Sequence, residues 1–152
     1  MAGFMTDKGA YKWHDYVVGA ATLPTNFYVA LIRSTSVPDA DTQTLGELTQ
    51  IAGGTGYTTN GYELTPGATD FDGISEEAGY GKFQIKDVTW TASGDDLDAT
   101  GNGARYAVMT DDNVTPASRL VLFGWDLGAD RNVSDGQTLT LQNLEGRISQ
   151  PA

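Results

Sequence analysis

The residues of this sequence that could do chemistry are one histidine and several clusters of carboxylates. His14 stands between Trp13 and Asp15. A catalytic histidine needs a nucleophile beside it, and the chain contains no Gly-x-Ser-x-Gly elbow. A histidine-based zinc site is also excluded for a single chain, because it would need further His or Cys ligands and the chain has one histidine and no cysteine. We therefore expect His14 at the surface or in an interface.

The carboxylates form four clusters in polar, glycine-rich stretches. Glycoside hydrolysis requires two carboxylates that face each other across a cleft at about 5–10 Å. Calcium, which prefers oxygen ligands, is an alternative for the third cluster, although its spacing is not that of an EF-hand loop. Solvated turns are the expected structure, so we predict no catalytic residue, no cofactor and no metal site. The clusters are Asp39/Asp41, Glu76/Glu77, Asp95/Asp96/Asp98 and Asp111/Asp112.

Three aromatic residues near the N-terminus, Tyr11, Trp13 and Tyr16, are the candidate partner interface. They belong to a segment for which the sequence predicts a helix over residues 6–20. Ala10, Trp13, Val17 and Ala20 recur at helical spacing, and Thr6 can cap the first turn. An aromatic helix at a chain end can dock on a partner, or it can pack across one end of its own domain. A second, shorter helix is expected within residues 42–51.

The remaining apolar runs are short, rich in β-branched and aromatic residues, and bounded by Gly, Pro, Asp or Asn, which is typical of strands. The first has apolar residues at both parities, so we expect it to be buried on both faces. Asn60-Gly61 predicts a hairpin turn, and residues 66–79 are expected to be loop. The predicted strands are 27–33, 80–85, 88–92, 104–109, 120–125 and 137–141.

These elements predict a mainly β protein, an antiparallel β-sandwich or barrel-like single domain with a short N-terminal helix. The domain spans residues 1–152, with a helical N-terminal segment over 1–20 and a β-domain over 26–149. The polar gaps between the last three strands are too short for the helices of a doubly wound α/β fold.

Composition narrows the classes of partner. Nine Lys and Arg against twenty Asp and Glu give a net charge of −11. Phosphate backbones would be repelled, so we expect no nucleic acid partner. No apolar run approaches the eighteen or so residues of a membrane span, so no membrane is expected. The absence of cysteine agrees with synthesis in a reducing host cytoplasm.

The order of the segments resembles a broad group of small β-rich virion proteins encoded by tailed bacteriophages. A helical stretch is followed by a "YVAL" strand, a "GTGYT" segment, a "VTW" strand, an "ARYAV…DD" strand and loop, a "LxGxxDxG" strand and a "DGxTLT" strand. The resemblance covers most of the chain. The matching positions are 28–31, 54–58, 88–90, 104–112, 122–128 and 135–140.

The resemblance implies a non-enzymatic virion structural protein, with capsid decoration or cementing as the expected role. The partner would then be the major capsid protein, and the chain would act on the capsid exterior as a homo-oligomer, with a trimer favoured. Two alternatives stay open. One is a tail- or fibre-associated module that contacts the host surface, and the other is a glycan-binding or carbohydrate-active domain, for which a Trp-lined cleft with two facing carboxylates would be evidence.

Overall fold

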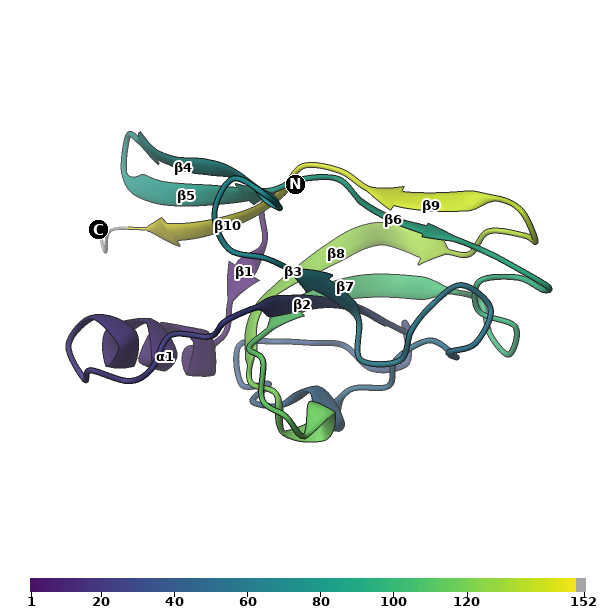
Figure 1. Ribbon diagram of the computed structural model, residues 1–152, viewed down its shortest axis with the longest axis horizontal. Helices are drawn as coiled ribbons and strands as arrows, with labels where there is room; N and C mark the ends of the chain where they lie inside the picture. The colour runs from purple at the N-terminus through teal and green to yellow at the C-terminus, as the bar shows by residue number, and fades with distance from the viewer. Residues whose placement is uncertain (150–152) are drawn as a thin grey trace.

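The computed structural model describes residues 1–149 and confirms the predicted class. Strands make up 40% of the chain and helix 11%, and antiparallel sheets pack as a single domain (Figure 1). No helix in this part of the chain is long and apolar enough to cross a membrane.

The first layer is a five-stranded sheet in which every neighbouring pair is antiparallel. Its long strands come from the predicted runs near residues 27, 104 and 120, and two short strands complete its edges. In spatial order the strands are β1 (Phe4–Met5), β8 (Val121–Arg131), β7 (Ala104–Thr110), β2 (Phe27–Ile32) and β3 (Tyr62–Leu64).

The second layer is built on two chain segments that pair along their length. β5 (Tyr80–Ile85) continues into β6 (Val88–Thr91), and β9 (Thr138–Leu141) continues into β10 (Leu144–Ser149). β5 pairs with β10 and β6 with β9, while β4 (Phe71–Glu77) adds an edge to β5 (Figure 1). The strands predicted over 80–85, 88–92 and 137–141 are thereby confirmed.

Strand β2 is buried on both faces, as predicted. Val29, Ala30, Leu31 and Ile32 all have 0% exposure. Val29 and Leu31 contribute to the main core between the two layers, whereas Ala30 and Ile32 contribute to a smaller cluster on the opposite face. The sheet therefore needs an apolar cover on each side.

The second face is covered by the segment in which a short second helix was predicted, within residues 42–51, and the helix that forms there is shorter than the apolar spacing suggested. A single 3-10 turn forms, η1 (Leu45–Glu47), and the side chain of its first residue, Leu45, is buried. After η1 the chain runs extended beside the end of β2. The N–H of Ile51 donates to the Leu31 carbonyl, and the N–H of Arg33 donates to the Thr49 carbonyl. Tertiary pairing with the end of β2 outweighs the helical spacing of the apolar residues.

Two further expectations differ from the structure. Asn60 and Gly61 do adopt positive φ, at 89° and 98°, but they do not join two paired strands, since β3 pairs with β2. The loop predicted over 66–79 contains β4, whose residues beyond Phe71 are all exposed. An exposed edge strand has no apolar alternation, so nothing in its sequence pattern marks it as a strand.

Asp98 ties the loops at one end of the domain together. Its carboxylate is almost fully buried and accepts hydrogen bonds from Arg33 Nη2 at 2.7 Å and from the N–H groups of Ala52 and Gly103. Burial alone would raise the pKa of Asp98, but these donors outweigh it and hold the pKa below its ordinary value. The acidic loop near residue 95 is thus anchored by an ion pair.

We expect Asp98→Asn to lower the free energy of unfolding by about 3 kcal/mol, because it leaves Arg33 without its partner. This is the low end of the range for a buried pair, since the Arg33 side chain is 26% exposed. The depressed pKa adds a pH signature. The contribution is complete above about pH 5, where Asp98 is ionised in both the folded and the unfolded chain, and it is lost as the pH falls through the folded-state pKa.

Urea unfolding at several pH values would measure both effects. The native chain should lose stability more steeply than Asp98→Asn between about pH 5 and pH 3. Equal slopes for the two proteins would show that Asp98 contributes no acid-sensitive stability.

Candidate functional site

The helix predicted over residues 6–20 forms as α1 (Asp7–Val17) and is fastened to the first sheet by the residue that caps it. The Thr6 hydroxyl accepts a hydrogen bond from the Gly9 N–H at 2.8 Å and donates to the Val121 carbonyl. The Thr6 N–H donates to the Leu122 carbonyl at 3.1 Å. Thr6 is fully buried, so this end of α1 is part of the domain and not an appendage.

The helix approaches β8 closely because residue 9 is a glycine. A Cβ at Gly9 would lie 2.2 Å from the Leu122 carbonyl oxygen, a distance that no real side chain tolerates. Gly9, Trp13 and Tyr16 then share the face turned toward the sheet, at the i, i+4, i+7 spacing of one helix face. The sequence analysis placed Val17 on the apolar face of the helix, and that prediction is wrong. Val17 is 71% exposed, and Tyr16 takes its place on this face.

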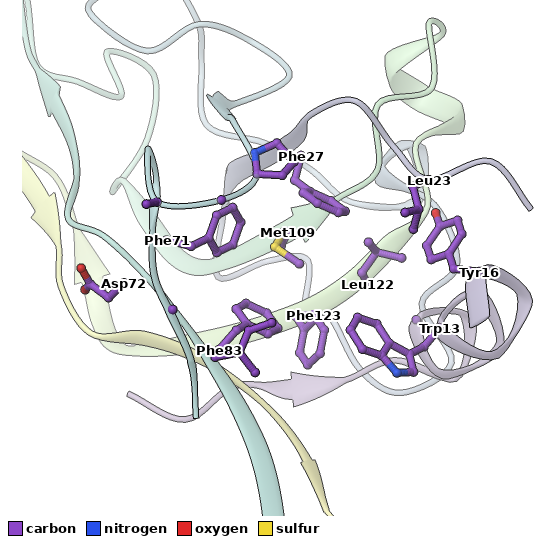
Figure 2. Close-up of a pocket in the computed structure, with 16 residues that line it drawn as sticks. Trp13, Tyr16, Leu23, Phe27, Phe71, Asp72, Phe83, Met109, Leu122 and Phe123 are labelled. Carbon is purple, nitrogen blue, oxygen red and sulfur yellow. The ribbon is translucent and has the colours of Figure 1, made fainter. Parts of the chain in front are cut away.

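A groove of about 480 Å³ opens between α1 and the hairpin formed by β4 and β5. Trp13, Tyr16 and Leu23 line one side, and Phe71 and Phe83 line the other (Figure 2). The lining is almost entirely apolar. When a folded protein exposes a contiguous apolar surface to water, that surface is often a binding site.

The floor of the groove is continuous with the closed core. Phe27, Met109, Leu122 and Phe123 form it. Ring contacts run from Phe71 through Phe83 to Phe123, with centroids 6.0 and 5.0 Å apart, and end at the buried Trp125. A ligand in the groove would therefore extend the hydrophobic core.

A β-bulge in β4 directs a further apolar side chain to the groove. Phe71 pairs with Ile85 and Ile74 pairs with Phe83, and the register shifts between Phe71 and Gly73. Ile85 and Phe83 are two residues apart on β5, so the bulge places Phe71 and Ile74 on the same face. Gly73 permits this with φ at 120°. Ile74 lines the groove and is 85% exposed.

The three aromatic residues singled out from the sequence separate in the structure. Trp13 and Tyr16 line the groove, whereas Tyr11 lies outside it, 61% exposed, with the Lys8 ammonium over its ring. Sequence reasoning missed Phe71 and Ile74, because their segment was expected to be loop. Of the two alternatives for the helix, packing on its own domain is observed, and docking on a partner stays a prediction.

The groove lacks the paired carboxylates of a glycosidase. Asp72 is the one carboxylate among its lining residues, and it lies at the rim. The prediction of solvated turns fails for two of the acidic clusters, because Glu76 and Glu77 lie in strand β4 and Asp98 is buried in its ion pair with Arg33. The other two clusters hold loops in place. Asp39 accepts from the N–H groups of Asp41 and Thr42, and Asp112 accepts from Thr25 and Asn26. Within residues 1–149, no group of three His, Asp or Glu side chains is placed to hold a metal ion.

Tyr16 is the other ionisable group in the groove. Burial, followed by the nearby Asp111 carboxylate, raises the pKa of Tyr16. Its phenol therefore stays neutral across the physiological range and presents mainly an aromatic surface.

Comparison with protein-family models, with curated proteins and with solved structures finds no match to this chain. The groove's own geometry and chemistry therefore carry the functional argument.

We expect Gly9→Ala to destabilise the protein by about 1–2 kcal/mol, although alanine is the better helix former by about 1 kcal/mol. The added methyl group meets the Leu122 backbone and pushes α1 off β8. Thermal unfolding monitored by circular dichroism would measure the change. Gly81→Ala is the matched control, since a Cβ there meets nothing within 4 Å. A more stable Gly9→Ala protein would contradict the close helix contact.

Proposed function

We propose that this chain is a non-enzymatic bacteriophage virion structural protein, a capsid decoration or cement protein that binds the assembled head. The observation that carries the binding role is the open aromatic groove between α1 and the β4–β5 hairpin. The order of strand and loop motifs, which resembles small virion proteins of tailed phages, supplies the setting. A groove with a single carboxylate at its rim supports binding without catalysis.

The proposed mechanism is thermodynamic linkage. A protein that binds the assembled lattice but not its separated subunits stabilises the lattice by RT ln(1 + [L]/Kd) at each site. Apolar side chains of the major capsid protein that enter the groove would be removed from water, at about 25 cal/mol per Å² of apolar surface. Aromatic anchors of this kind dominate the energy of many interfaces.

The charge of the chain supports an exterior position. A protein with net charge −11 is repelled by packaged DNA, so the outer face of the capsid is the favourable one. Copies at local three-fold positions would form a trimer, because closed symmetric assemblies let identical subunits bury complementary surfaces.

Two variants test the groove as the capsid contact. We expect Trp13→Ala to weaken binding to purified capsids that lack this chain by at least tenfold in Kd, because Trp13 lines the groove. Tyr11→Ala is the matched control, because Tyr11 is an aromatic residue of the same helix but lies outside the groove. Co-sedimentation with capsids would measure both, and circular dichroism would verify folding. Equal losses for the two variants would contradict the groove as the contact.

Copy number tests the role itself. Quantitative mass spectrometry of purified virions should find hundreds of copies of this chain, in fixed ratio to the major capsid protein. A handful of copies would contradict capsid decoration and favour the tail- or fibre-associated alternative.

A further inference from the structure

The free edge of β4 lies beside the groove and determines what kind of partner segment fits. Among residues 1–149, β4 pairs with β5 alone in the sheet order β10–β5–β4. Beyond Phe71, whose N–H donates to the Gly67 carbonyl, its second edge therefore has no partner strand in this part of the chain. Such an edge can accept an extended strand from another chain, with backbone hydrogen bonds supplying affinity and side-chain pockets supplying specificity. The edge and the groove share Phe71 and Ile74.

The side chains of β4 define a pattern for that strand. Ile74 and Glu76 pair with Phe83 and Gly81, so they point to the face of the groove, whereas Asp72 accepts a hydrogen bond from Gln84 Nε2 at 3.5 Å on the other face of the hairpin. A strand beside β4 would place one residue opposite Ile74 and, two positions away, another opposite Glu76. An apolar residue suits the first position, because Ile74 is 85% exposed above the aromatic floor.

The charges of the hairpin favour a cationic partner. Lys82 of β5 is paired with Glu77, and Arg147 of β10 is paired with Glu145. Asp72 and Glu76 form no ion pair with any of the residues in the described part of the chain. A Lys or Arg residue two positions from the apolar residue of an added strand would complement Glu76 on the groove face.

The same carboxylates disfavour a second copy of this chain. A two-fold pairing of β4 edges centred on Ile74 would bring the acidic residues of one copy, Asp72, Glu76 and Glu77, close to those of the other. Like charges brought together in this way destabilise a strand pair. Each copy also carries a net charge of −11, which adds to the repulsion.

We propose that the groove and the β4 edge together bind an extended strand of another protein, in which an apolar side chain and a basic side chain two positions away face the groove. The added strand extends the β10–β5–β4 sheet, inserts its apolar side chain beside Ile74, and places its cation near Glu76. A peptide with a basic residue on each side of the apolar one meets this pattern in either strand direction. This inference rests on the proposed function only in taking the groove as the binding site.

A synthetic peptide tests the pattern directly. The probe is acetylated and amidated Thr-Lys-Thr-Ile-Thr-Lys-Thr, the same length as the seven residues of β4. Titration into the full-length protein, followed by amide NMR, should give saturable binding with a Kd below about 1 mM and shifts centred on β4. Replacing both Lys by Glu should weaken binding at least tenfold. Methylating alternate backbone nitrogens along the pairing edge should weaken it similarly.

Protein variants locate the site. Ile74→Asp should weaken peptide binding at least tenfold, and Glu76→Gln should remove most of its salt dependence. Val114→Asp is the control, since Val114 is 96% exposed and does not line the groove. Absence of saturable binding, or equal binding of the methylated or acidic peptide, would overturn the proposal.

Two outcomes separate this inference from its rivals. A concentration-dependent dimer in sedimentation that Ile74→Asp dissociates would overturn it in favour of a second copy. A virion with few copies of the chain would contradict capsid decoration while leaving the peptide result intact, so the two failures are distinguishable.

Discussion

The two-sided burial of β2 is the constraint on which the rest of the structure depends. Four consecutive residues, Val29 to Ile32, have no exposure to water, so apolar cover is required on both sides of the first sheet. The second layer provides one cover and the segment around Leu45 provides the other. The buried backbone of β2 must also find partners, and the Tyr57 hydroxyl meets this need where β3 ends, by accepting from the Leu31 N–H and donating to Gln50.

This arrangement closes one end of the domain and leaves the other open. Around Trp125 the core is sealed, since the indole N–H donates to the Glu145 carbonyl and Gly3 packs against the ring. At the far end of the same aromatic series, α1 and the β4–β5 hairpin stand apart, and the groove between them stays open. Thr6 and Gly9 fix α1 on β8, so the helix side of the groove is held by buried contacts.

Sequence reasoning predicts the elements whose residues are buried in the core or cap a helix. The strands at 27–32, 80–85, 88–91, 104–110 and 138–141, and the helix capped by Thr6, were predictable because apolar and capping residues mark them. β4 was not predictable, because its residues beyond Phe71 are exposed and carry no alternation. The candidate site divides in the same way. Trp13 and Tyr16 were identifiable as helix aromatics, but Ile74 reaches the groove through a register shift that only the paired structure reveals.

Electrostatics explains how an open apolar groove and a free strand edge can coexist in one protein. Both features invite self-association, and edge strands in natural proteins are commonly protected by charge and by bulges. β4 carries both protections, a bulge at Asp72–Gly73 and the carboxylates of Asp72, Glu76 and Glu77. A homo-oligomer of this chain would therefore need a contact that keeps the β4 edges apart. Repulsion between like copies leaves this edge free for a basic partner, so the feature that prevents aggregation also selects the ligand.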